Sequence, residues 1–488
     1  MIRFTTDLPE FTIDLHDVIR LFTGNTPISA EEGDVWLRHT HEERDDQWIE
    51  TATCGELRQQ HAEPVCSGSE VERRRMLKRA AKTALFLLLR QLHGFTPPWG
   101  SLTGIRPTRL MYEAMAEGLS PAEAERALQA RYFVSPEKAA LLSEIVEMQR
   151  GVYAVPPDQF DLYIGIPFCT TRCLYCSFSS GEIGNGRRTE PYVQALLREI
   201  ERCGQLMRET GYRVRAAYMG GGTPTALSAD QLRRLLEAAQ REFPGAAEWT
   251  VEAGRPDTID RAKLQVLKDS HIDRISVNPQ TFSDDTLRKI GRAHSASETI
   301  RAFWLAREMG FSHINMDLIA ALPGETMADF ERSLDTCLAL RPESITVHSL
   351  SVKRSSRLHE RIVTGGAAYL QADIPEAARM ISSAREKLKR SDYHPYYLYR
   401  QKYMAGNLEN VGYAKPGHAC LYNIGNMEET ARVLALGAGA ISKWLFDRER
   451  RIERAPNLRN IDAYIDRVDE MVERKRRLIL EDDGRCAE

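Results

Sequence analysis

Hydrophobic and polar positions alternate with two different periods along the middle of the chain. Short apolar runs of strand length recur between residues 161 and 349, and stretches with the 3.6-residue period of an amphipathic helix separate them. Strands that alternate with helices predict βαβ units and therefore a parallel sheet. The predicted strands are 161–166, 214–219, 248–252, 273–278, 313–319 and 344–349, and the predicted helices are 191–209, 228–242, 260–270, 295–309 and 326–340.

The two flanks of this alternating region follow other patterns. Residues 1–60 are acidic and poorly periodic, which favours a small sheet, and Pro156 and Pro157 mark a linker. Helical patterns outside the alternating region cover residues 70–92, 121–131, 136–150, 373–389 and 461–480. We therefore predict an N-terminal α+β domain (1–155), an α/β domain (156–372) and a C-terminal region with a helical tail (373–488).

Composition and charge exclude several classes of protein. The net charge of −3 is spread over 488 residues, so no basic field indicates a nucleic-acid partner. No run approaches about 18 uncharged apolar residues, so we expect no membrane span. The start of the chain has no basic segment followed by an apolar run, and the nine cysteines form no disulfide framework. Both observations favour the cytoplasm, where thiols stay reduced.

Three cysteines directly follow the first predicted strand of the alternating region. Cys169, Cys173 and Cys176 have the spacing C-x3-C-x2-C, and thiolates this close favour zinc or an iron–sulfur cluster. Both normally take four protein ligands, so three cysteines leave one metal position open for a non-protein ligand. A partial zinc site, or thiols that act as small buried hydrophobes, are the alternatives.

Further polar groups follow the other predicted strands. In a parallel barrel the residues that carry the chemistry lie at the carboxyl ends of the strands. Gly220-Gly-Gly-Thr-Pro-Thr closes the second strand, where glycines let the backbone approach a ligand and leave N–H groups free. Glu252 ends the third strand and could accept hydrogen bonds from a ribose or an ammonium group, or be a surface charge. His348 and Ser351 end the sixth strand, where the histidine could be a base or a core residue.

The cysteine spacing, with the aromatic Tyr175 before the last cysteine, resembles that of the radical S-adenosylmethionine (SAM) enzymes. The resemblance implies a partial (β/α)6 barrel of the TIM type and a [4Fe–4S] cluster whose open iron holds the amino and carboxylate groups of SAM. It assigns the cluster to Cys169, Cys173 and Cys176. It further implies SAM contacts from Gly221, Gly222, Thr223, Tyr163, Tyr175 and Phe178, although aromatic residues near a strand can also be core. Glu252 is a further predicted SAM contact because of its place at the end of the third strand.

Later segments narrow the resemblance to the oxygen-independent coproporphyrinogen III oxidase family, in its HemZ-like branch. Gln280-Thr-Phe, Arg292 and Asp317-Leu-Ile are similar to family residues that hold a second SAM molecule or a ligand beside the first. Arg292 could instead be a solvated helix charge, and Ser351 joins the predicted cofactor contacts. The resemblance covers nearly the whole chain, including Trp99-Gly-Ser-Leu-Thr-Gly-Ile-Arg-Pro.

This resemblance implies oxidative decarboxylation of the propionates of coproporphyrinogen III to vinyl groups, in haem biosynthesis. The porphyrinogen is then the small-molecule substrate, and the cluster requires an external one-electron donor of the flavodoxin or ferredoxin type. Residues 400–440 would cover the substrate, with Arg400, Gln401 and Lys402 either meeting propionates or lying in a solvated loop.

One position departs from the family pattern. Phe178 stands where the best-characterised oxidases carry a further cysteine, and this puts an identical reaction in doubt. A haem-binding chaperone is the first alternative, because such relatives also have phenylalanine there. Their His-Asn-x-x-Tyr-Trp signature, however, corresponds to Arg400-Gln-Lys-Tyr-Met in this chain. A radical SAM methyltransferase that uses two SAM molecules is the second alternative.

Overall fold

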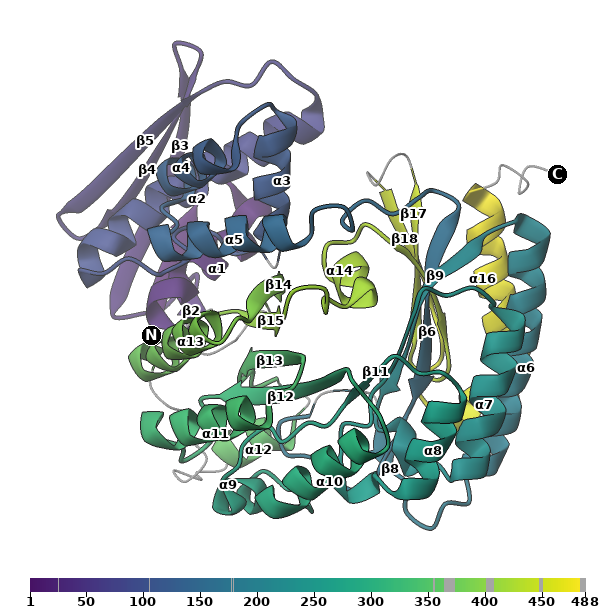
Figure 1. The fold of residues 1–488 in the computed structure, drawn as a ribbon. Coiled ribbons are helices and arrows are strands. Elements are labelled where there is room, and N and C mark those ends of the chain that lie inside the picture. Colours follow the sequence, from purple (N-terminus) through teal and green to yellow (C-terminus); the bar gives the residue numbers. More distant parts are fainter. Residues whose placement is uncertain are drawn as a thin grey trace. The chain divides into compact units, whose positions relative to one another are not determined.

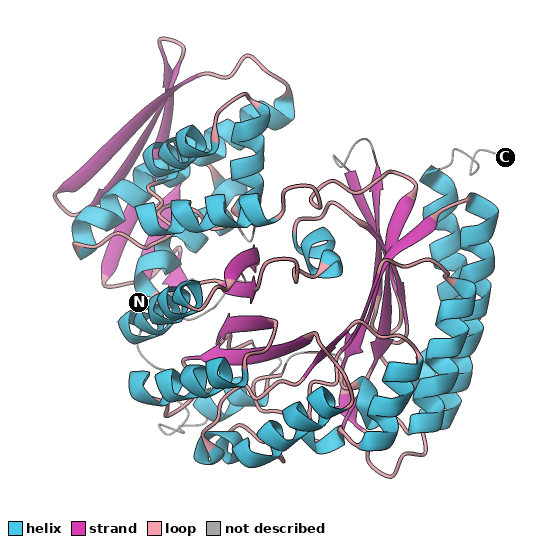
Figure 2. Ribbon diagram, in the orientation of Figure 1, coloured by secondary structure: helices cyan, strands magenta, loops and turns pink. Residues whose placement is uncertain are grey.

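The computed structural model describes residues 1–24, 26–104, 106–176, 178, 180–353, 356–363, 374–400, 408–446 and 451–482. The described residues form two compact units. The first comprises Met1–Val146 and Tyr399–Glu409, and the second comprises Glu147–Leu398 and Asn410–Glu488. Figure 1 labels the elements of both units, and Figure 2 separates helices from strands.

The first unit is an α+β structure. Among its described residues the strand order is β2-β1-β3-β4-β5, with β1 parallel to β2 and β3 and the remaining pairs antiparallel. Its strands are β1 (Ile2–Thr6), β2 (Ile28–Ser29), β3 (Val35–Arg44), β4 (Gln47–Cys54) and β5 (Leu57–Pro64). Its helices are α1 (Thr12–Thr23), α2 (Glu70–His93), α3 (Thr108–Ala116), α4 (Pro121–Tyr132) and α5 (Pro136–Met148). The helices predicted at 70–92, 121–131 and 136–150 are confirmed.

Helix α2 shows why these elements form where the sequence places them. Ser69 and Glu72 form a reciprocal capping box at its start, and Gly94 ends it in the left-handed conformation. Its apolar face, including Leu85 and Leu89, is fully buried in the core that this helix shares with α1 and the sheet. Burial of this face, more than intrinsic propensity, stabilises the helix.

The returning segment around Glu409 is part of the first unit. The Glu409 carboxylate lies 2.7 Å from the Lys138 ammonium group and accepts a hydrogen bond of 2.7 Å from the Trp99 indole. Arg400 is buried and donates to the carbonyl oxygens of Leu102 (2.9 Å) and Gly104. Arg400 therefore binds its own chain here, while the predicted propionate contacts Gln401 and Lys402 lie outside the described residues.

The second unit contains the predicted parallel sheet. Six neighbouring strands run parallel to one another. In their order across the sheet they are β6 (Gln159–Ile166), β9 (Arg213–Gly221), β10 (Glu248–Val251), β11 (Arg274–Ser276), β12 (Ile314–Ala320) and β13 (Ser344–Ser349). These are the predicted strands, and each is confirmed to within a few residues. Their carboxyl ends share one edge of the sheet, which is where the predicted site residues follow.

The predicted helices of this unit are α6 (Thr189–Thr210), α7 (Ala229–Glu242), α8 (Arg261–Asp269), α10 (Ala296–Glu308) and α11 (Met327–Leu340). They lie along one side of the parallel strands (Figure 1). A side-chain oxygen caps the start of four of these helices. The capping residues are Ser228 for α7, Asp260 for α8, Ser295 for α10 and Thr326 for α11. The short helix α9 (Asp284–Lys289), capped by Ser283, was not predicted.

The C-terminal part of the chain extends the same sheet at both edges. Among the described residues the sheet has eleven strands in the order β14-β15-β13-β12-β11-β10-β9-β6-β16-β17-β18. The added strands are β14 (His394–Tyr399), β15 (Asn410–Ala414), β16 (Arg432–Leu436), β17 (Ile441–Phe446) and β18 (Arg451–Pro456). The predicted division into three domains stays a prediction.

Helices complete this part: α12 (Arg357–Val363), α13 (Ile374–Arg390), α14 (Leu421–Met427), α15 (Ile461–Asp466) and α16 (Val468–Asp482). The prediction of a single tail helix at 461–480 is wrong in one respect, because the helix is interrupted at Arg467 and forms two helices, α15 and α16. The break lets Tyr464 and Lys475 both reach the buried carboxylate of Glu199 on α6, each at 2.7 Å. Within the described residues, no helix combines the length and apolarity needed to cross a membrane.

Candidate functional site

The cysteine loop begins directly after β6. Phe168–Cys169 form the short strand β7, which pairs with β8 (Gly181–Glu182) and closes the loop at its base. Cys173 is buried at 9% exposure, whereas Cys169 and Cys176 are partly exposed. Burial raises the pKa of the Cys176 thiol, and the neighbouring cysteines add to this rise. A bound cation would reverse such a shift, because it stabilises thiolates.

Among the described residues, no group of three His, Cys, Asp or Glu side chains is placed to hold one metal ion. Zinc draws its ligands around one centre. An iron–sulfur cube takes each cysteine on a separate iron and therefore accepts sulfurs that are further apart.

Backbone contacts from two neighbouring loops hold the cysteine loop. The Leu174 N–H donates to the Ile290 carbonyl at 2.9 Å, and the Thr171 hydroxyl donates to the Gly291 carbonyl at 3.0 Å. The Thr223 hydroxyl lies 3.5 Å from the sulfur of Cys169. The loop is thus positioned by the end of β9 and by the segment that follows α9.

The glycines at the end of β9 allow two backbone segments to touch. The Gly222 N–H donates to the Ile166 carbonyl at 2.8 Å, and the Thr223 N–H donates to the Phe168 carbonyl at 2.7 Å. A Cβ at Gly222 would lie 2.6 Å from the Phe168 oxygen, and a Cβ at Gly221, where φ is +101°, would lie 2.9 Å from the Tyr163 hydroxyl. Glycine is required here because protein atoms fill this space, a reason that differs from the predicted ligand approach.

Glu252 is half-buried, beside the glycines. Its carboxylate accepts a hydrogen bond of 2.5 Å from the Tyr218 hydroxyl and one of 3.3 Å from the Gly221 N–H. Burial, assisted by the charge of Asp317, raises the pKa of Glu252 from its ordinary 4.5 to about 7, although the Tyr218 hydrogen bond opposes the rise. Glu252 is therefore no surface charge, and a cation bound beside it would favour its ionised form.

This shift predicts a pH-dependent stability. A carboxyl group whose pKa is raised on folding stabilises the folded state below pH 4.5 and loses that contribution as pH rises through about 7. We expect Glu252→Gln, which stays neutral, to remove this loss, so that the stability of the variant relative to wild type increases by about 3 kcal/mol between pH 4 and pH 8. Urea unfolding of both proteins across this range measures the difference, and a constant difference would contradict the assignment.

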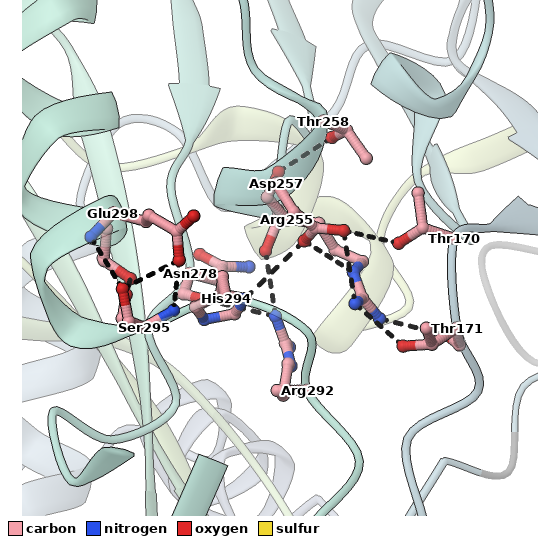
Figure 3. A network of polar contacts seen from close by, with 12 residues as sticks. Thr170, Thr171, Arg255, Asp257, Thr258, Asn278, Arg292, His294, Ser295 and Glu298 are labelled. Carbon is pink, nitrogen blue, oxygen red and sulfur yellow. Dashed lines mark hydrogen bonds and ion pairs between the residues drawn. The ribbon is translucent and has the colours of Figure 1, made fainter. Parts of the chain in front are cut away.

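Arg292 is directed into the site and is not a solvated charge. Its guanidinium donates to the carbonyls of Gly254 and Asn278, each at 3.3 Å, and to the Tyr175 hydroxyl at 3.2 Å. Figure 3 shows Arg292 beside Asn278 and His294 in one polar network. The Asn278 amide in turn donates to the Asp317 carboxylate at 2.7 Å. Arg292, Tyr175 and Asp317, which were predicted to belong to one site, are thus joined, and Asn278 links them.

Gln280 and Asp317 share a backbone connection. The Gln280 N–H donates to the Asp317 carbonyl at 2.9 Å, and Gln280 is buried with a left-handed φ of +68°. The His348 imidazole lies 3.7 Å from the Asp317 carboxylate. Burial alone would raise the pKa of Asp317, but the nearby His348 and the hydrogen bond of 2.8 Å from the Asn315 amide lower it below its ordinary value. His348 is thereby a partner of Asp317.

The predicted aromatic contacts divide into two groups. The Tyr163 ring stacks with those of Tyr218 and Tyr422, with ring centres 6.4 and 6.2 Å apart. Phe178, in contrast, is 69% exposed, so its predicted contact with SAM stays a prediction. Tyr218 and Tyr422 were missed by the sequence analysis. Tyr422 belongs to α14, far along the chain, and no motif marked it.

Buried polar atoms test whether these residues fit SAM. Within the described residues, Asn278 Oδ1, Arg292 Nε and Ser351 Oγ are buried and have no hydrogen-bond partner. Such atoms are costly to leave unsatisfied. An amino acid joined to a nucleoside offers donors and acceptors for all three. Together with three cysteines on one loop, these atoms fit a [4Fe–4S] cluster and SAM.

The fold and the three-cysteine loop define a radical SAM protein. The family described as "Radical SAM superfamily" matches residues 163–337. In structure the chain is similar to coproporphyrinogen III oxidase (HemN) from Escherichia coli, with a TM-score of 0.52, 22% identity, and coverage of 69% of this chain and 73% of that one. This likeness confirms the predicted barrel fold.

Two curated relatives indicate which family of radical SAM proteins the chain belongs to. The chain is 41% identical over 401 residues to the oxygen-independent coproporphyrinogen-III oxidase-like protein HemZ of Bacillus subtilis (strain 168), covering 80% of this chain and 79% of the relative. It is 34% identical to the heme chaperone HemW of the same organism, covering 48% of this chain and 62% of the relative. The chain belongs to the HemZ-like branch of the oxygen-independent coproporphyrinogen III oxidase family. Radical SAM proteins use a [4Fe–4S] cluster and SAM, as the resemblance implied.

Proposed function

We propose that the chain catalyses the oxygen-independent decarboxylation of coproporphyrinogen III propionates to vinyl groups. The observation that supports this most strongly is the 41% identity to a relative named as an oxidase-like protein, because it extends over 80% of the chain and not over the barrel alone. The substrate comes from this likeness, whereas the class of chemistry follows from the site.

The residues of the site have distinct roles in this proposal. Cys169, Cys173 and Cys176 would hold the cluster through their three thiolates. Bound there, the cluster and SAM supply a one-electron reductive cleavage that generates the hydrogen-abstracting group. Arg292 and Asn278 would bind and orient SAM through Arg292 Nε and Asn278 Oδ1, the donor and acceptor atoms that lack partners among the described residues.

Other residues of the barrel interior control charge and water. Glu252, when ionised, would accept hydrogen bonds from SAM. Tyr163, Tyr218 and Tyr422 form a stacked wall that would keep water from the reacting atoms. Each turnover removes one hydrogen atom from the β-carbon of a propionate, then CO2 and one electron. The reaction therefore needs an external one-electron donor for the cluster and an acceptor for the substrate electron.

An anaerobic assay tests the substrate separately from the chemistry. We expect protein with a reconstituted cluster, given SAM, dithionite, an electron acceptor and coproporphyrinogen III, to release 5′-deoxyadenosine and a vinyl product in proportion. Omitting the porphyrinogen should leave only slow, uncoupled SAM cleavage. Deoxyadenosine without any vinyl product would overturn the substrate assignment while retaining the class. S-Adenosylhomocysteine as the product would indicate the methyltransferase alternative.

A haem chaperone is the second candidate, because relatives of 28–36% identity carry that name. In this chain the region that corresponds to their histidine signature begins at the buried Arg400. Stable, stoichiometric haem binding without SAM cleavage would favour the chaperone over the oxidase. The same preparation can be titrated with haem after the anaerobic assay, so that one sample decides between the two.

A further inference from the structure

A buried arginine lies behind the cysteine loop. Arg255 follows β10 and is 3% exposed. Its Nη1 donates to the Thr171 carbonyl at 3.0 Å and lies 3.6 Å from the sulfur of Cys173, and its Nη2 donates to the Thr171 hydroxyl at 2.9 Å. Figure 3 shows the guanidinium between Thr171 and Asp257. One buried cation thus contacts both the backbone of the loop and a cysteine sulfur.

Asp257 and His294 fix the direction of this cation. The Asp257 carboxylate accepts from Arg255 Nε at 3.1 Å and from the Thr170 hydroxyl at 2.6 Å. The His294 imidazole is fully buried, 3.6 Å from the same carboxylate. The carboxylate therefore binds the Nε side of the guanidinium, and the positive end of the ion pair points at the sulfur of Cys173.

We propose that Arg255 is a positioning residue that raises the reduction potential of the cluster, and that Asp257 and His294 hold it against Cys173. This inference rests on the proposed role of Cys173 as a cluster ligand. Reduction adds negative charge to the cluster, and an N–H donor and a positive charge at a coordinating sulfur stabilise the reduced form. Because Arg255 is buried, water screens its charge only weakly. A donor of moderate potential can then reduce the cluster.

Variants of Arg255 separate this role from simple support of the loop. We expect reconstituted Arg255→Gln to retain the iron and sulfide content of wild type, while its equilibrium constant for one-electron reduction falls about tenfold, a midpoint potential about 59 mV more negative. Arg255→Lys keeps the charge and should recover most of this loss. Redox titration followed by electron paramagnetic resonance measures both. Arg288→Gln, which removes an exposed charge on α9, is the matched control and should leave the potential unchanged.

A change of opposite sign completes the test. Asp257→Asn removes the negative end of the ion pair and should make the potential more positive, which also decides the matter if Arg255→Gln fails to fold. An unchanged potential in Arg255→Gln with full iron content, or in Asp257→Asn, would overturn the inference and leave the proposed function intact. A complete cluster in Cys173→Ala would instead overturn the cysteine assignment on which both rest.

Discussion

Cys173→Ala is expected to abolish SAM cleavage. An iron–sulfur cluster depends on each of its thiolate ligands, and with two cysteines left the cube loses a further corner. A complete cluster contributes about four iron atoms per chain, and after anaerobic reconstitution we expect the variant to contain far fewer. Deoxyadenosine release should fall more than about 100-fold, since the cofactors carry the chemistry. Iron analysis and product chromatography measure the two effects.

Cys66→Ala is the matched control for this experiment. Cys66 is a partly exposed cysteine of the first unit, remote in sequence from the motif. The same substitution there should leave both iron content and SAM cleavage unchanged. Equal losses in the two variants would show that a general effect of cysteine removal, and not cluster ligation, explains the result.

Gly222→Ala is expected to have the next largest effect, although it adds only a methyl group. The new Cβ would lie 2.6 Å from the Phe168 carbonyl oxygen and 2.7 Å from the Ile166 carbonyl oxygen. Both neighbours are backbone atoms, so relief requires the start of the cysteine loop to move. We expect a loss of about 1–3 kcal/mol in unfolding free energy and a loss of about 100-fold in SAM cleavage from the displaced loop.

Gly181→Ala provides the comparison for Gly222→Ala. Gly181 lies in β8, and a Cβ there meets nothing within 4 Å. The unfolding free energy and the SAM cleavage of the Gly181→Ala variant should therefore match those of wild type. If Gly222→Ala behaves like Gly181→Ala in both measurements, the close approach of β9 to the cysteine loop has no role in positioning it.

The sheet could be predicted because its strands are buried on both faces. The strands around 161–166 and 344–349 are buried at nearly every position, and the capping residues between the strands mark where each helix begins. Short elements could not be predicted, because they carry too little pattern of their own. The six-residue helix α9 has too few positions to show a period, and β7 depends on pairing with β8.

The site was predictable where its residues lie in motifs, and only there. The cysteines, Glu252 and Arg292 follow strands whose carboxyl ends meet, so strand order alone brings them to one edge of the sheet. Arg255 reaches Thr171 across 84 positions of sequence, and such a contact requires the loops to be placed. The stretch Arg255-Pro-Asp-Thr, which follows the strand predicted at 248–252, was the available signal.

The central claim is that three cysteines hold an iron–sulfur cube whose fourth iron binds SAM. Mössbauer spectroscopy of 57Fe-reconstituted protein, recorded with and without SAM, tests it most directly. The account predicts a [4Fe–4S] spectrum in which one iron changes its isomer shift and quadrupole splitting when SAM is added. A spectrum without a cube, or a cube whose four irons are unaffected by SAM, would contradict it.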